Sequence, residues 1–279
     1  MRFGVNTFIW AASFDSKAIP LEAIKRNGID GIEVPIFDPQ DFDGDGVRAA
    51  QRQYDLQCTV CAVNPRGINP TSDDASVRAR SIEHWKRVIG AAAAAGARIV
   101  AGPIYAPVGY LPGRRRTAEE WSWGLDFLRA LDSALDDAGV TLAVEPLNRF
   151  ETYYLNTAAD AVKLVEQAGS RRVGILFDTF HANLEEKDVA AAYRHCGRHL
   201  AHVHACENDR GIPGSGHVDW PGVFQALKAV GYDGWLTIES FNSTIKELAA
   251  ATAIWRDLAP SLDDIAFQGT AFLKRMAAA

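Results

Sequence analysis

Four short apolar runs in the second half of the chain each end in a side chain that can bind a metal ion. The runs cover residues 141–145, 173–178, 200–204 and 235–239. Their last residues are Glu145, Asp178, His204 and Glu239, with separations of 33, 26 and 35 positions, about one strand and one helix each. Two glutamates, one aspartate and one histidine make a mainly oxygen-donating ligand set of the kind that divalent cations prefer. The pattern therefore predicts a divalent-metal site at successive strand ends.

Strand-like runs alternate with helix-like segments along the whole chain. We predict strands near residues 2–6, 31–35, 57–63, 98–103, 141–145, 173–178, 200–205 and 235–239. We predict helices near residues 17–27, 45–54, 75–95, 117–138, 157–168, 187–196, 219–230 and 244–258. Eight such repeats without a linker predict an α/β protein, a single (β/α)₈ TIM barrel in which residues 1–279 form one domain. Active sites of these barrels lie at the C-terminal ends of the strands, where the four candidate ligands fall.

Each candidate ligand has a plainer interpretation when it is taken alone. A single acidic residue at a strand end, such as Asp178, is more often a helix cap or a solvated loop residue. Four at consecutive strand ends favour a shared cation, because charges at the mouth of a packed barrel need compensation. His202 shares a strand face with His204 but lies deeper, so we expect it to support the site or the core. Three further polar residues follow the ligands closely, and we expect them on binding loops: Glu151, His181 and Arg210.

The composition narrows the classes of partner. The 279 residues carry a formal net charge of -6, with 48% hydrophobic and 23% charged residues, which is ordinary for a globular protein with a large core. An acidic chain disfavours nucleic acid, and no apolar run approaches the roughly 18 residues that cross a bilayer. The N-terminal residues lack a signal-peptide pattern. We therefore expect a cytoplasmic protein with a small uncharged substrate, and no nucleic-acid or membrane partner.

The four cysteines are too few for a disulfide framework in a chain of this length. Cys58 and Cys61 have the spacing of half a redox or zinc motif. However, a separation of three places the two side chains on opposite faces of a strand. We therefore predict packed free thiols.

The segments around the candidate ligands resemble the ketose 3-epimerases, the D-tagatose and D-allulose (D-psicose) 3-epimerase group. The matching motifs lie in residues 145–151, 178–186, 202–210, 232–239 and 255–258. The resemblance implies a xylose-isomerase-like TIM barrel that uses a divalent metal, with Mn²⁺ expected and Co²⁺ or Mg²⁺ as alternatives. It implies the same metal ligands, namely Glu145, Asp178, His204 and Glu239, and a homodimer or homotetramer.

The resemblance also implies a reaction. A metal-dependent epimerase would invert C3 of a free ketose (D-tagatose, D-fructose/D-allulose or a ribulose-type sugar) through a cis-enediolate. Glu145 and Glu239 would be the catalytic acid/base pair on opposite faces of C3. The sugar would be contacted by Glu151, His181 and Arg210.

Departures from the family pattern leave a second reaction open. They fall at residues 6–8, 103–110 and 217–220, and at Ser240. At the position of Ser240 the epimerases usually have proline. We expect all these positions to line the distal end of the sugar. The alternative is an aldose–ketose, inosose or 3-keto-sugar isomerase with the same metal site. A phosphodiester hydrolase of the same superfamily fits less well, because the chain is acidic and has only seven histidines. A non-catalytic sugar-binding protein fits poorly too, because both acid/base carboxylates are present.

Overall fold

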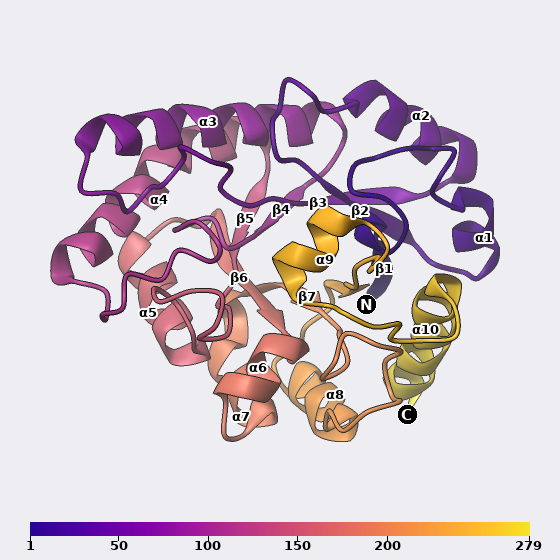
Figure 1. Cartoon of the computed structure of the whole chain (residues 1–279). Coiled ribbons are helices and arrows are strands. Elements are labelled where there is room, and N and C mark those ends of the chain that lie inside the picture. The colour runs from indigo at the N-terminus through magenta and orange to yellow at the C-terminus, as the bar shows by residue number, and fades with distance from the viewer.

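Eight parallel strands form a closed barrel in chain order in the computed structural model, which describes residues 1–279 (Figure 1). The strands are β1 (Arg2–Asn6), β2 (Gly31–Pro35), β3 (Gln57–Cys61), β4 (Ile99–Gly102), β5 (Thr141–Val144), β6 (Val173–Asp178), β7 (Leu200–His204) and β8 (Trp235–Ile238). The last strand pairs with the first, so the sheet has no free edge. The predicted TIM barrel is confirmed.

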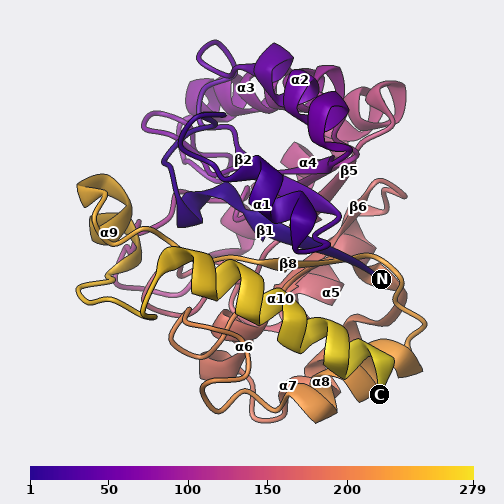
Figure 2. The ribbon, with the colours of Figure 1, turned by 90° about the vertical axis from the view of Figure 1, so that its right-hand side faces the viewer.

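Helices surround the barrel (Figure 1). They are α1 (Leu21–Arg26), α2 (Gly44–Tyr54), α3 (Ala75–Ala94), α4 (Ala118–Ala138), α5 (Ala158–Ala168), α6 (Thr179–Glu185), α7 (Val189–Cys196), α8 (Trp220–Ala229), α9 (Lys246–Thr252) and α10 (Leu262–Ala278). Two of them, α6 and α10, were not predicted, and α10 lies between α8 and α1 (Figures 1 and 2). The predicted helix at 244–258 was too long, because Ala253 adopts a left-handed conformation and ends α9.

Local signals explain where the helices begin and end. Thr117 and Glu120 form a capping box at the start of α4, in which each side chain accepts the backbone N–H of the other. Gly139 closes α4 with a φ of +63°, which glycine adopts without steric cost. Asp219 caps α8, with Pro221 in its first turn. These local signals therefore set both ends of α4 and the start of α8.

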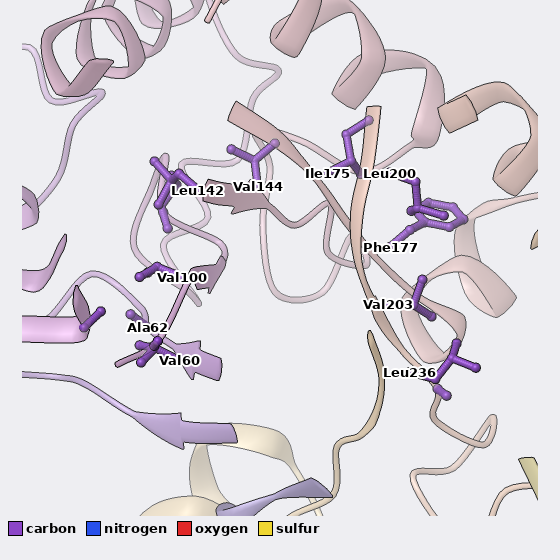
Figure 3. Close-up of a cluster of buried hydrophobic side chains, with 14 of the residues drawn as sticks. Val60, Ala62, Val100, Leu142, Val144, Ile175, Phe177, Leu200, Val203 and Leu236 are labelled. Carbon is purple, nitrogen blue, oxygen red and sulfur yellow. The ribbon is translucent and has the colours of Figure 1, made fainter. Parts of the chain in front are cut away.

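The two faces of the strands have different residues. Large apolar side chains at alternate positions face the helices (Figure 3). Figure 3 labels Val60, Ala62, Val100, Leu142, Val144, Ile175, Phe177, Leu200, Val203 and Leu236. A separate small cluster of Ala101, Ala143 and Leu176 lies on the inner face. Closer to the mouth the buried inward positions are polar, and this places charged groups where the strands end.

The cysteines are free and buried, as predicted. Cys58 belongs to the main apolar core, whereas Cys61 packs with Phe8 and Leu248 in a separate cluster. The two thiols therefore lie on opposite faces of β3. None of the helices combines the length and the apolar character that crossing a membrane requires.

Candidate active site

The four candidate ligands converge at the C-terminal mouth of the barrel. Asp178 and His204 are the last residues of β6 and β7, while Glu145 and Glu239 directly follow β5 and β8. One ligand atom from each residue lies within 4.8 Å of those from the other three, and all four side chains are buried. The sequence spacing predicted this convergence, because the strands are parallel and neighbouring.

Glu145 is held by the end of β4. Its N–H donates to the carbonyl of Gly102 at 3.1 Å, and its carbonyl accepts the Tyr105 hydroxyl at 2.8 Å. Gly102 has a φ of +140°, and a Cβ there would lie 2.2 Å from the carbonyl oxygen of Ala62. Only glycine allows this approach of β4 to β3, so Gly102 helps to set the position of Glu145.

Asp178 performs two tasks with its two oxygens. Oδ1 accepts the N–H of Phe180 at 2.8 Å and caps α6, while Oδ2 faces the cluster and accepts Arg210 Nη1 at 3.1 Å. The plainer interpretation of Asp178 as a helix cap is therefore correct for one oxygen. The other oxygen remains available to a cation.

Two buried acceptors in this cluster indicate that the residues fit a divalent cation. Glu145 Oε1 and His204 Nδ1 have no hydrogen-bond partner. His204 Nδ1 lies 3.4 Å from Glu239 Oε2 and 3.8 Å from Glu145 Oε1. Buried polar atoms are nearly always satisfied, so acceptors that face one another point to a shared positive ligand. Three carboxylates and one imidazole suit Mn²⁺ and similar ions.

Arg210 supplies the fixed positive charge. It lies on the β7–α8 loop, as predicted, and its buried guanidinium donates from Nη1 to Glu239 Oε2 at 2.7 Å as well as to Asp178. Nη2 lies 3.1 Å from His181 Nε2. The rings of Phe180 and Phe241 lie 4.1 and 5.1 Å from its central carbon. These cation–π contacts stabilise the guanidinium between the two rings.

His181 lies in helix α6, so the prediction that it is on a loop was wrong. The cap from Asp178 starts this short helix directly after β6 and brings the imidazole back over the cluster. Nδ1 accepts the backbone N–H of Asn148 at 3.1 Å. Burial, together with Arg210, lowers the pKa of His181 well below its usual value, so the imidazole is neutral.

Glu151 lies at the edge of the cluster and is half-buried. Its Oε1 accepts Asn148 Nδ2 at 2.7 Å, and burial raises its pKa. The carboxyl lines the same cavity as Glu145, His204 and Glu239. All seven residues singled out from the sequence therefore meet at one site.

Two carboxyls of the cluster have pKa shifts of opposite sign. Burial raises the pKa of Glu145, and Glu239 and Asp178 raise it further. Burial by itself also raises the pKa of Glu239, but His204 and Arg210 attract its carboxylate and leave the pKa below the usual value. Carboxyls whose environments separate their pKa values are typical of acid/base pairs.

Sequence reasoning missed Glu33 on β2. It is completely buried, and its two oxygens lie 2.7 Å from Nε2 of His202 and 2.7 Å from Nε2 of His204. Burial by itself raises its pKa, but the two imidazoles leave the pKa well below the usual value. The available signal was a lone carboxylate inside the apolar run 31–36. His202 lies beneath the site, as expected.

A cavity that is open to solvent lies above the cluster. Its floor is polar and its walls are apolar. The floor comprises Glu145, Glu151, His181, His204, Arg210 and Glu239. The walls include Phe8, Phe37, Val108, Leu147, Phe241 and Leu248. Phe8 packs against Phe37 and Phe241 with ring centroids 5.7 and 5.3 Å apart, so one wall is aromatic.

The positions that depart from the family motif have mixed locations. Phe8, Pro103 and Val108 line the cavity, in agreement with the expectation for a distal sugar pocket. The side chain of Asn6 instead donates to Glu33 at 3.1 Å. Ser240 donates from Oγ to the carbonyl of Arg210 at 2.7 Å. The last two therefore support the polar floor.

A family model described as "Xylose isomerase-like TIM barrel" matches residues 21–265, which is most of the chain. The chain is 37% identical to a probable ketose 3-epimerase from Synechocystis sp., with 99% of this chain and 96% of the relative covered. It is 36% identical to an L-ribulose 3-epimerase from Mesorhizobium japonicum, covering 92% and 88%. A D-allulose 3-epimerase from Methylomonas sp., solved with D-allulose, superposes with a TM-score of 0.93 at 26% identity, covering 99% and 97%.

The chain belongs to the ketose 3-epimerases of the xylose isomerase-like TIM barrel family. It is therefore an enzyme of the isomerase class, a sugar epimerase that acts at C3.

Proposed function

We propose that the protein is a metal-dependent epimerase of free ketoses, such as D-tagatose, D-fructose/D-allulose or ribulose-type sugars. The observation that carries this proposal is the cluster of Glu145, Asp178, His204 and Glu239, in which Glu145 Oε1 and His204 Nδ1 are buried without a hydrogen-bond partner. These four residues would hold Mn²⁺, with Co²⁺ or Mg²⁺ as alternatives. A bound divalent cation supplies a Lewis acid that stabilises the negative charge of an enediolate.

Glu145 and Glu239 would move the proton. The hydrogen on C3 is weakly acidic because C2 is a ketone, and one carboxylate removes it to leave the enediolate. The other carboxyl returns a proton to the opposite face, and C3 is inverted. The opposite pKa shifts of the two carboxyls suit this division of donor and acceptor.

The remaining floor residues would hold the sugar. Arg210 would provide donors beside the two carboxyls, where oxygens on C2 and C3 acquire charge, and His181 would contact the sugar next to it. Glu151, with its raised pKa, would accept or donate a hydrogen bond to a hydroxyl. Each of these side chains would contact the sugar from the position that it has in the structure.

The cavity favours an unphosphorylated sugar. Arg210 is the only lysine or arginine among the residues that line it, and its guanidinium already pairs with Asp178 and Glu239. A phosphate at the distal end would meet the aromatic wall of Phe8, Phe37 and Phe241 without a charged partner.

The test is product analysis with purified protein and Mn²⁺. Fructose, tagatose, ribulose and xylulose are each incubated in D₂O, and the sugars are separated and analysed by mass spectrometry and NMR. We expect the C3 epimer of at least one ketose, with deuterium at C3 of the product and little in the recovered substrate at early times. An aldose product would instead identify an isomerase, and the absence of any C3 epimer would contradict the proposal.

We also propose a homodimer or homotetramer that acts in the cytoplasm, with residues 1–279 as one domain. The aromatic side chains of Phe150 and Trp255 are 71% and 74% exposed, and a second copy of the chain would bury them. Four free cysteines suit a reducing compartment. Light scattering tests the assembly: a monomer at micromolar concentration would contradict it.

A further inference from the structure

Glu33 lies in β2 and reaches across the interior of the barrel to β7. Its Oε1 is 2.7 Å from His204 Nε2, and its Oε2 is 2.7 Å from His202 Nε2. All three side chains are at most 1% exposed. A carboxylate only accepts hydrogen bonds, so each imidazole at this distance donates its Nε2–H.

Two further donors fix Glu33 as an acceptor. Asn6 Nδ2 donates to Oε1 at 3.1 Å, and Asn6 Oδ1 accepts the N–H of Phe8 at 2.9 Å. The second contact determines which end of the amide is the donor, because a backbone N–H cannot accept. Thr59 Oγ1 donates to Oε2 at 3.0 Å. A protonated carboxyl group would place its own O–H against one of these four donors. Glu33 is therefore a carboxylate.

The carboxylate cannot turn away from His204. Thr59 and His202 hold Oε2, so Oε1 stays against His204. With its proton on Nε2, His204 has only Nδ1 left as a lone-pair donor. Nδ1 is the buried atom without a hydrogen-bond partner that faces Glu145 and Glu239.

We propose that Glu33 is a positioning residue for metal binding: it fixes the tautomer and the orientation of His204 so that Nδ1 faces the three carboxylates. A carboxylate behind a metal-binding imidazole increases the electron density on the ligating nitrogen. Removal of such a partner typically weakens metal binding about ten- to hundredfold. The inference rests on the ligand set of the proposed function and adds a residue outside it.

The first test measures Mn²⁺ affinity by titration calorimetry in the wild type and in Glu33→Gln. The glutamine keeps the shape of the side chain, but its one carbonyl oxygen can accept from only one imidazole, and its amide N–H₂ opposes the other. We expect the dissociation constant for Mn²⁺ to rise about ten- to hundredfold.

Glu120→Gln is the matched control. Glu120 is another buried carboxylate with several donors, since Arg114, Tyr153 and Thr117 all donate to it. It has no contact with the metal cluster, so this variant should lose thermal stability and keep the Mn²⁺ affinity of the wild type.

A second measurement needs no variant. Nitrogen-15 NMR of the metal-free wild type should show protons on Nε2 of His202 and His204 that exchange slowly and resonate far downfield. Absence of a proton from His204 Nε2 would overturn the inference even if Glu33→Gln fails to fold. Wild-type affinity in a folded Glu33→Gln would overturn the role of Glu33 alone. Failure of the wild type to bind Mn²⁺ would overturn the ligand set and this inference with it.

Discussion

Ser240 gives the sharpest test of how the polar floor is held. It directly follows Glu239, and its buried hydroxyl donates to the carbonyl of Arg210 at 2.7 Å. Arg210 has a φ of +64°, in the left-handed region that costs a residue with a Cβ roughly 1 kcal/mol. Its N–H donates to the carbonyl of Glu207 at 3.0 Å. We expect these contacts to hold the backbone from which the guanidinium reaches Asp178 and Glu239.

Ser240→Ala removes the hydroxyl and leaves the rest of the strand end intact. A buried neutral hydrogen bond contributes about 1 kcal/mol, and a carbonyl left without a donor costs up to about 3 kcal/mol. If about 1 kcal/mol of this is lost from the transition state, kcat/KM falls about fivefold. The loss should appear mainly in kcat/KM, because the proposed function places the guanidinium against the bound sugar.

The assay is steady-state kinetics at saturating Mn²⁺ on the best ketose of the panel. Ser215→Ala is the control. Ser215 Oγ also donates at 2.7 Å to a backbone carbonyl, that of Ile212, in the loop that carries Arg210, but Ser215 is exposed and does not line the cavity. We expect Ser215→Ala to keep wild-type kcat/KM. Thermal unfolding of both variants separates a local effect from a loss of stability.

A double-mutant cycle with Arg210→Ala decides whether Ser240 acts through Arg210. If it does, Ser240→Ala costs little further activity once the guanidinium is absent. Independent roles would give additive losses. Unchanged kcat/KM in Ser240→Ala, or additivity with Arg210→Ala, would refute the reasoning.

Four other outcomes follow from the structure. Glu145→Gln and Glu239→Gln should each lower kcat by about 10²–10⁴ with the circular-dichroism spectrum of a folded barrel, and retained turnover in either would remove the two-base mechanism. Chelation of the metal should abolish activity and lower Tm, because an ion present at a hundred times its Kd stabilises the fold by about 2.7 kcal/mol. Added Mn²⁺ should restore Tm, as measured by scanning calorimetry. Gly102→Ala should lower both Tm and activity because its Cβ would meet the carbonyl of Ala62 at 2.2 Å, whereas a wild-type Tm would show that β4 can shift. The hydrogen bond from Arg114 lowers the pKa of Glu120. The stability that this carboxylate contributes is therefore present above the usual glutamate pKa and is lost as pH falls through the lowered pKa. Denaturant unfolding at a series of pH values should show a weaker loss of stability in acid for Glu120→Gln than for the wild type.

The fold could be predicted from the sequence because the local signals agree with the barrel. Apolar runs of four to six residues separated by amphipathic segments predicted all eight strands within about two residues of their ends. Helix α6 was missed because it is short and starts directly at Asp178, without a polar turn between strand and helix. Helix α10 follows the eighth repeat, so the count of strand–helix units gave no reason to expect it.

The sequence predicted only the part of the site that lies at the ends of the strands. Residues at the ends of neighbouring parallel strands meet whatever the intervening sequence, so Glu145, Asp178, His204 and Glu239 could be grouped from spacing alone. Glu33 contacts His204 across 171 positions and from a strand on another side of the barrel. That contact depends on which inward residues are long enough to cross the interior, and no local pattern contains this information.

The two imidazoles of the floor show why the supporting residues matter to the chemistry. His204 donates from Nε2 to Glu33, which leaves Nδ1 as an acceptor among three carboxylates. His181 accepts at Nδ1 from the backbone N–H of Asn148, and its Nε2 lies 3.1 Å from Arg210 Nη2. In each ring the partner at one nitrogen decides which nitrogen faces the site. Under the proposed function His204 would offer Nδ1 to the cation, so the chemistry of this ring would depend on Glu33, which lies outside the ligand set.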